Sequence, residues 1–282
     1  MEVLTILKSK DDLDKVNTGI IVGLNKFSTN YNVSLTLDEI RELSKKRDVF
    51  VVVNKVIFNE EIDELTYNLC ELSKMNIKGI FFYDLSIIQI NKVNNLNLNL
   101  IWNQTHMVTN YNTCNFYYKN GVKGCMLANE LTIDEMCEIK NKTELEVFAN
   151  VIFKPIMSHS RRSLLTNYFK SIGKDKEDRD YVISEKVSKM NYIVKEDETG
   201  TSIIYGNIVN GIEPLYKMID NSFNYVVIDK TYLTDKEYDN GIDLVNRIIN
   251  NEISKEEAIE LSNKYFGNDT GFFYKRTIYK VK

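Results

Sequence analysis

The sequence predicts a (β/α)₈ barrel of the TIM type, and two observations favour this fold class. Short apolar runs rich in β-branched residues alternate with longer amphipathic segments, which is the pattern of repeated βα units around a parallel sheet. Eight runs read as strands, at Val3 to Leu7, Gly19 to Leu24, Val49 to Asn54, Gly79 to Asp84, Leu98 to Gln104, Gly124 to Asn129, Leu145 to Ile152 and Tyr225 to Asp229. A chain of 282 residues suits one such barrel, so we expect a single domain over 1–282.

Amphipathic segments between these runs predict the helices of the barrel. They lie at Asp11 to Val16, Leu37 to Lys46, Glu60 to Met75, Ile87 to Val93, Thr109 to Lys119 and Ile133 to Lys140. Thr132 and Glu135 have the spacing of a capping box at one helix start. Two more helices are expected at Leu233 to Asn250 and Lys255 to Phe266, and the tail from Gly271 alternates like an edge strand.

One interval breaks this rhythm, because roughly seventy residues separate Phe153 from Asn224 and one crossover needs far fewer. We predict an insertion over 154–222 that contains a small helix around Ser163 to Lys170. A β-hairpin of Asn191 to Lys195 and Ser202 to Tyr205 should follow the helix. This insertion precedes the last strand and is expected to lie over the barrel mouth.

The charge and composition of the sequence argue against several classes of function. Thirty-six Lys and Arg against 40 Asp and Glu give a net charge of -4, which does not support a broad grip on the phosphate backbone of RNA, although a local basic patch stays open. The sequence contains neither a membrane-spanning apolar run nor a signal-peptide pattern, so a cytoplasmic protein without membrane association is expected. Four cysteines without a CxxC spacing are expected to be buried thiols.

Polar residues at the strand ends are the first candidates for a site, because chemistry in this fold gathers at the C-terminal face of the barrel. They are Asn25, Asn54, Asp84, Asn103, Gln104, Glu130, Asn150 and Asp229. Two carboxylates in one pocket could act as acid and base. Asp84 and Asp229 could instead cap the helices that follow their strands.

The two histidines, His106 and His159, cannot form a His₃ zinc site and match no metal-ligand motif, so no metal is expected and ordinary hydrogen-bonded histidines are the simpler interpretation. A mixed site of a histidine with Glu130 or Asp84 stays open. Nucleophile elbows and Gly-rich phosphate loops are absent from the sequence, and no cofactor is expected. The basic pair Arg161-Arg162 could clamp an anionic group or brace the insertion against acidic residues.

We assign a catalytic role to Glu130, His106 and Arg162. The expected ligand is a peptide or small molecule. Its candidate binding residues are Asn25, Asn54, Gln104, His159, Arg161, Asn167 and Tyr168.

The segment Arg162-Ser163-Leu164-Leu165-Thr166-Asn167-Tyr168 resembles the Arg-Cys-Leu-Leu-Ser-Asn-Tyr signature of the collagenase-like peptidase family, peptidase family U32. Further stretches that are similar to the family, in chain order, are Gly23 to Ser28, Asn54 with Asn59 to Glu61, Gln104 to Asn110, Ala128 to Leu131, Leu145 to Phe148 and Gly271 to Tyr279.

The resemblance implies a barrel fold and a nominal peptidase activity. It also implies relatives that hydroxylate RNA bases or quinone precursors with an iron-sulfur cluster on four cysteines. Ile156 and Ser163 occupy the first two of those ligand positions, and Asn129 replaces an arginine before Glu130. We therefore expect a divergent member without the cluster. It is either a peptidase or a non-catalytic partner of a modifying family member, as a homo- or hetero-oligomer; retained RNA hydroxylation through another cofactor is the least supported alternative.

Overall fold

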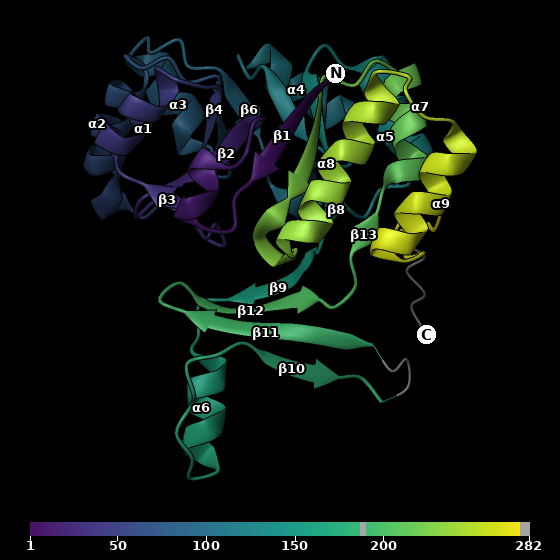
Figure 1. Cartoon of the computed structure of the whole chain (residues 1–282). Coiled ribbons are helices and arrows are strands. Elements are labelled where there is room, and N and C mark those ends of the chain that lie inside the picture. The colour runs from purple at the N-terminus through teal and green to yellow at the C-terminus, as the bar shows by residue number, and fades with distance from the viewer. Residues whose placement is uncertain (187–189, 277–282) are drawn as a thin grey trace, which may run out of the picture.

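A computed structural model describes residues 1–186 and 190–276 and shows a closed barrel of parallel strands ringed by helices (Figure 1). All eight strands expected from the sequence are confirmed. They are β1 (Glu2–Ile6), β2 (Gly19–Leu24), β4 (Val49–Val53), β5 (Gly79–Phe82), β6 (Leu100–Trp102), β7 (Gly124–Met126), β8 (Glu146–Phe153) and β14 (Tyr225–Asp229). The barrel closes because β1 pairs in parallel with both β2 and β14. The two-residue strand β3 (Ser34–Leu35) adds to β2 outside this ring.

Helices cover the outside of the barrel, largely as the periodicity indicated. They are α1 (Leu37–Ser44), α2 (Ile62–Leu72), α3 (Ser86–Val93), α4 (Tyr111–Lys119), α5 (Ile133–Lys142), α7 (Ile212–Asp220), α8 (Asp235–Ile249) and α9 (Lys255–Phe266). Short 3₁₀ helices are η1 (Lys10–Asp14), η2 (Asn59–Glu61), η3 (Thr105–Met107) and η4 (Lys230–Tyr232). The predicted capping box is present, since the Thr132 hydroxyl accepts from the backbone N–H of Glu135. None of the helices in the described ranges combines the length and apolar character that crossing a bilayer requires.

Two helix expectations differ from the structure. The segment predicted as a helix from Asp11 to Val16 forms only the 3₁₀ helix η1, because the Asp12 carboxylate accepts from the backbone N–H groups of Lys8 and Ser9 and holds the chain in a tight turn. Helix α7 was not predicted, although it buries one apolar face and has Pro214 in its first turn, a position that Pro tolerates.

The interior of the barrel is packed rather than hollow. Its buried side chains are Leu4, Ile6, Ile21, Phe50, Val52, Phe81, Ile101, Met126, Phe148 and Val227. Aromatic rings dominate this interior: the Phe81 and Phe148 rings meet edge to face at 5.1 Å, and Tyr225 stacks on Phe148 at 4.2 Å. A packed interior leaves the C-terminal mouth as the place for a ligand.

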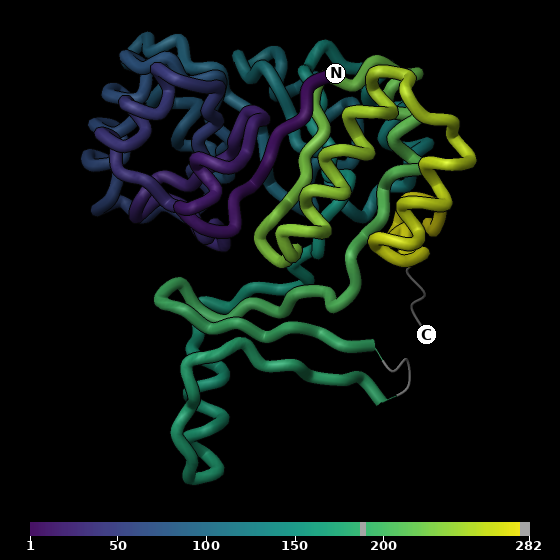
Figure 2. Tube along the Cα trace, in the orientation of Figure 1, coloured from purple at the N-terminus to yellow at the C-terminus, as the bar shows by residue number. Residues whose placement is uncertain are grey.

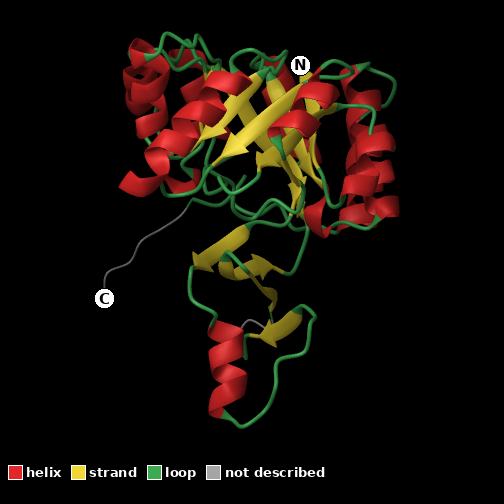
Figure 3. Ribbon diagram, turned by 90° about the vertical axis from the view of Figure 1, so that its left-hand side faces the viewer, coloured by secondary structure: helices red, strands yellow, loops and turns green. Residues whose placement is uncertain are grey.

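The chain leaves the barrel after β8 and builds a second, antiparallel sheet. Its strands are β9 (Ile156–Ser160), β10 (Tyr181–Ser184), β11 (Asn191–Asp197) and β12 (Gly200–Tyr205), in the order β10-β11-β12-β9. Figure 2 shows this sheet below the barrel. The tube and the turned view of Figure 3 agree that α6 (Leu164–Ser171) lies on its far side. The predicted helix and the β11–β12 hairpin are present, and β9 and β10 are strands that the sequence did not indicate.

The insertion ends when β13 (Val209–Asn210) pairs antiparallel with β8 and returns the chain to the barrel. Helix α7 then contacts α5, α8 and α9, so it belongs with the barrel helices although the expected insertion, 154–222, included it. We propose that the whole chain is one barrel domain, with the inserted sheet bounded near Lys154 and Ile208.

The tail expected as an edge strand lies partly outside the described residues. Its described part, up to Arg276, forms a turn. Phe273 is buried and its carbonyl accepts from the backbone N–H of Ile133, which holds the turn beside the start of α5. This segment consequently forms part of the wall of the barrel mouth.

A buried ion pair stabilises the closure between the first and the last strand of the barrel. Lys230, directly after β14, lies 2.7 Å from Asp12 in η1, and the side chains are only 3% and 4% exposed. The Lys230 ammonium also lies 4.9 Å from the ring centroid of Tyr238 and 2.9 Å from Asp235, whose side chain is 71% exposed. Burial alone would raise the pKa of Asp12, but the hydrogen bonds from Lys230, Ser9 and Lys8 hold it below its usual value.

Lys230→Met is expected to lower the free energy of unfolding by about 3–5 kcal/mol, because it leaves the Asp12 carboxylate buried without its partner. Urea unfolding at neutral pH measures this loss. The pKa of Asp12 is lower in the folded state than in the unfolded state. Its ionised carboxylate therefore stabilises the wild-type protein above the unfolded pKa, and this stability is lost as the pH falls. The difference in unfolding free energy between wild type and Lys230→Met should consequently shrink in acid. Asp235→Asn removes the exposed partner of the same lysine and should change little; equal losses in the two variants would refute the role of burial.

Candidate functional site

A cavity of about 1690 Å³ lies at the C-terminal face of the barrel, between the strand ends and the inserted sheet. Its floor includes Met126, Asn150 and Asp229 from three barrel strands or their ends, and its far wall includes His159 and Tyr205 from the inserted sheet. Roughly 300–1,000 Å³ is usual for a pocket that holds a small molecule, so this cavity has room for a segment of a larger ligand.

Two of the predicted catalytic residues meet at the rim of this cavity. The Nδ1 atom of His106 in η3 lies 2.9 Å from Oε1 of Glu130, which follows β7. A carboxylate that accepts a hydrogen bond from Nδ1–H fixes the orientation of the imidazole and leaves Nε2 as the acceptor. Histidines that act as general bases or as metal ligands are oriented in this way. The two side chains are 60% and 46% exposed, so the pair lies in contact with solvent.

Paired amides form part of the floor of the cavity. The Asn150 Nδ2 group donates to Oδ1 of Asn129 at 2.9 Å, which links the end region of β7 to β8. The Oδ1 atom of Asn150 is buried and has no hydrogen-bond partner in the described part of the chain. A buried amide oxygen without a partner is costly in the empty protein, so a donor group of a ligand would stabilise it.

Asp229, at the end of β14, is the carboxylate that burial perturbs most clearly in the cavity. Burial raises the pKa of its carboxyl group above the usual range, although the hydrogen bond from the Thr231 backbone N–H at 2.9 Å acts in the opposite direction. Burial and the charge of Asp229 in turn raise the pKa of Tyr31. The expected capping role of Asp229 is confirmed at η4. Asp84 differs from this expectation, because Leu85 occupies the N-cap position of α3 and Asp84, one residue earlier, accepts from the Ser86 N–H.

The inserted sheet contributes two further predicted residues to the cavity. His159 on β9 lies with Nδ1 2.9 Å from the Ser202 hydroxyl, and Ser202 donates onward to the Asn30 side chain at 2.7 Å. The Arg161 guanidinium lies 5.1 Å from the ring centroid of Phe58. These contacts connect the inserted sheet to barrel loops on the opposite side of the cavity.

The remaining predicted site residues do not all line the cavity. Asn25 lines the cavity. Asn54 also lines it, and its side chain bonds both the N–H and the carbonyl of Thr29. Gln104 does not line it, because its amide donates to the Tyr83 carbonyl and accepts from the Trp102 indole. Arg162 is exposed outside the cavity lining.

Asn167 and Tyr168 are exposed on α6, also outside the cavity lining, so the structure does not bring them or Arg162 to the His106–Glu130 pair. Sequence reasoning missed Lys154 and Tyr31, both of which line the cavity. The strand-end rule could have found Lys154, which directly follows β8.

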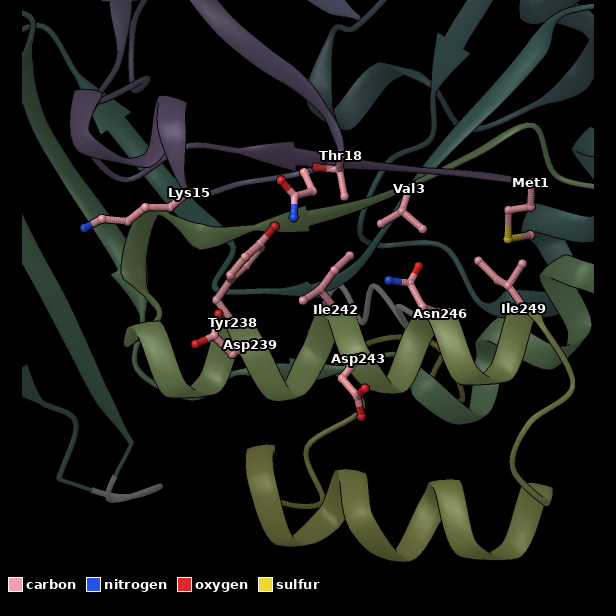
Figure 4. Close-up of a pocket in the computed structure, with 11 residues that line it drawn as sticks. Met1, Val3, Lys15, Thr18, Tyr238, Asp239, Ile242, Asp243, Asn246 and Ile249 are labelled. Atoms are coloured by element: carbon pink, nitrogen blue, oxygen red, sulfur yellow. The ribbon is translucent and has the colours of Figure 1, made fainter. Parts of the chain in front are cut away.

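A smaller cavity of about 550 Å³ lies on the outside of the barrel, between α8 and β1. Figure 4 shows Tyr238, Ile242 and Asn246 of α8 directed toward the strand that carries Val3. The first βα connection contains only the short η1 where other connections contain an α-helix, which leaves this side of β1 less covered. The groove is remote from the strand ends that form the mouth.

The cysteines do not fit an iron-sulfur cluster. Cys114 and Cys125 are buried with their sulfur atoms 3.9 Å apart between α4 and β7, Cys137 is buried on α5, and Cys70 lies on α2. The resemblance implies thiolates at two positions, which here are Ile156 on β9 and Ser163 directly before α6. Neither residue has the thiolate that holds an iron-sulfur cluster. Within the described ranges, no three His, Cys, Asp or Glu side chains lie close enough together to hold a metal ion.

The fold and its mouth define a (β/α)₈ barrel protein with a polar, ligand-sized cavity at the C-terminal face. A sequence profile of peptidase family U32 matches residues 8–278, so the chain belongs to this family.

Two curated relatives carry names that refer to tRNA. The tRNA hydroxylation protein P2 of Bacillus subtilis is 30% identical over 287 residues, which span 93% of this chain and 92% of that protein. The tRNA hydroxylation protein P of Haemophilus influenzae is 28% identical over 193 residues, or 67% of this chain and 39% of that protein. The solved U32 peptidase Mk0906 is similar over 55% of this chain and 70% of its own, with a TM-score of 0.43 and 15% identity.

Asp229→Asn is expected to raise the melting temperature at pH 7 by about 2 °C, since it keeps an acceptor for Thr231 but removes a carboxyl group whose charged form the site disfavours. The pKa of Asp229 is higher in the folded state, so the wild-type protein loses stability as pH rises from the unfolded value through the folded one. The advantage of the variant should therefore disappear below about pH 4.

Scanning calorimetry across pH measures this difference. Asp84→Asn makes the same change at a strand-end carboxylate that lies outside the cavity and accepts from the Ser86 N–H, and it is the matched control. A lower melting temperature for Asp229→Asn at neutral pH would contradict the argument.

Proposed function

We propose that this chain takes part in tRNA hydroxylation as a subunit that holds the substrate and pairs with another family member. The strongest support is the likeness to tRNA hydroxylation protein P2, which extends over nearly the whole length of both chains. The family name suggests a nominal peptidase activity, but the name of this relative does not mention one.

The cavity at the barrel mouth supports a role in holding part of a large ligand. Its volume of about 1690 Å³ exceeds what a small molecule fills. The Asn129–Asn150 pair places neutral hydrogen-bonding groups at the floor of the cavity, and the buried Oδ1 of Asn150 has no partner within the described residues. Neutral amides can recognise a base without a basic surface, which agrees with the net charge of -4.

The residues at the family ligand positions support pairing with a second chain. Ile156 and Ser163 cannot supply the thiolates of an iron-sulfur cluster, so redox chemistry has to come from a partner or from a different group. Two Bacillus subtilis relatives are named tRNA hydroxylation proteins P1 and P2, which is the pattern that a system of two related chains would give.

Hydrolysis is the second candidate, and the His106–Glu130 pair is the observation that favours it. A histidine oriented by a carboxylate at 2.9 Å can act as a general base on water at the rim of the cavity. The exposure of both side chains is less favourable, because catalytic pairs work best where water is excluded.

Deleting the gene in its own host should remove the hydroxylated nucleoside from bulk tRNA, and wild-type chain supplied in trans should restore it. Mass spectrometry of digested tRNA measures the nucleoside. Asn150→Leu should restore about tenfold less, because it removes the free amide oxygen of the cavity floor. Asn246→Leu makes the same change in the smaller groove and should restore fully. Unchanged nucleoside levels after deletion would overturn the proposal.

Purified chain tested on a peptide library separates the two candidates. A peptidase would release products, and His106→Asn would slow release by about 10²–10⁴-fold if the imidazole is the base. We expect no turnover by the wild-type protein. Turnover that His106→Asn abolishes would establish the hydrolytic reading.

A further inference from the structure

Lys154 differs from the other cationic residues of the mouth cavity. The lysines and arginines that line it are Lys26, Lys55, Lys154, Arg161, Lys195 and Lys275. Lys26 pairs with Glu64, Lys55 pairs with Glu61, and Lys195 donates to Asn32. Arg161 and Lys275 are exposed, whereas Lys154 is partly buried and has no hydrogen bond or ion pair within the described part of the chain.

The environment of Lys154 disfavours its own charge. Burial lowers the pKa of its amine, because desolvation costs the ammonium more than the neutral form. The charge of Glu237 raises that pKa, but its carboxylate already accepts from the N–H and hydroxyl of Thr234. An anionic group delivered by a ligand would stabilise the ammonium where the protein supplies no bonded counter-ion.

Lys154 occupies the part of this fold that commonly receives phosphate. It follows β8, the seventh strand of the barrel, and β14 is the eighth, with the short helix η4 directly after it. Phosphate groups in (β/α)₈ barrels frequently bind at the loops after these two strands, beside a short extra helix. The register of β8 against β14 shifts between Val227 and Ile228, and such a bulge redirects the side chains that follow it.

The backbone around Lys154 is well fixed. The carbonyl of Pro155 accepts from the N–H of Tyr205 at 2.9 Å, and Val209 pairs with Phe153 across β13 and β8. Proline also restricts the conformation of the residue before it. The peptide segment that carries Lys154 is therefore held at the wall of the cavity that Lys154 lines.

We propose that Lys154 forms a phosphate subsite within the mouth cavity. The inference rests on the proposed function in one respect: the phosphate would then belong to an RNA backbone. The alternative source with the same chemistry is a small phosphorylated metabolite.

Isothermal titration of the full chain with inorganic phosphate tests the subsite without any tRNA. We expect Lys154→Met to bind phosphate about tenfold more weakly than wild type, the size expected for losing one charge-assisted hydrogen bond. Lys195→Met removes the same charge from a cavity lysine that already has a partner, and should bind like wild type. Equal binding by wild type and Lys154→Met, or equal weakening in both variants, would overturn the subsite.

Lys154→Arg keeps the charge and should recover most of the binding, which separates loss of the ammonium from loss of the fold. Circular dichroism of each variant confirms folding. Sulfate, whose charge is constant over the range, is the probe for pH: its binding to wild type should weaken as pH rises through the lowered pKa of Lys154. Binding to Lys154→Arg should not weaken there. Binding of sulfate to wild type that is independent of pH up to strongly alkaline conditions would contradict the assignment.

Competition identifies the source of the phosphate. A short single-stranded RNA that displaces inorganic phosphate from wild type, but binds Lys154→Met more weakly, would support the backbone source. Displacement by glycerol phosphate and not by RNA would keep the subsite and reject the RNA source. Normal phosphate binding together with unchanged tRNA after gene deletion would reject the proposed function and leave the subsite standing.

Discussion

The buried ion pair between Asp12 and Lys230 is the interaction on which the closed barrel most depends. It joins the turn after the first barrel strand to the residue after the last barrel strand, at the seam where these two strands pair. The Lys8 side chain adds a bond to the Leu233 carbonyl across the same seam. Because the other barrel strands pair in the order in which the barrel strands follow one another along the chain, failure at this seam would open the sheet and expose its interior.

A closed and filled barrel determines where a ligand can bind. The rings of Phe81, Phe148 and Tyr225 fill the interior, so the space that remains lies above the strand ends. The inserted sheet converts that open face into a cavity, and the Ser202–Asn30 hydrogen bond connects its far wall to a barrel loop. The groups that face this space are mixed: neutral amides and a protonatable carboxyl on the floor, and a histidine–carboxylate pair at the rim.

Membership of peptidase family U32 and the chemistry of this mouth agree on a binding role more readily than on a redox one. Ile156 on the inserted sheet and Ser163 beside it occupy the positions where the family resemblance implies thiolate ligands. The thiols of Cys114 on α4 and Cys125 on β7 are instead buried in the core. In our proposals the partly buried amine of Lys154 supplies a charged contact to a ligand and the amide of Asn150 a neutral one.

The sequence alone determined the barrel, because the alternation of β-branched runs with amphipathic segments is local and each element follows from its own residues. It also located the mouth, since strand ends can be counted, and it proposed His106 with Glu130 before their contact was visible. Only the tertiary structure decided that Gln104 is used in hydrogen bonds to Tyr83 and Trp102 and that Arg162 is exposed outside the cavity lining. Burial and pairing depend on residues distant in sequence, and for the same reason only the folded chain revealed the pKa of Asp229 and the unpaired amine of Lys154.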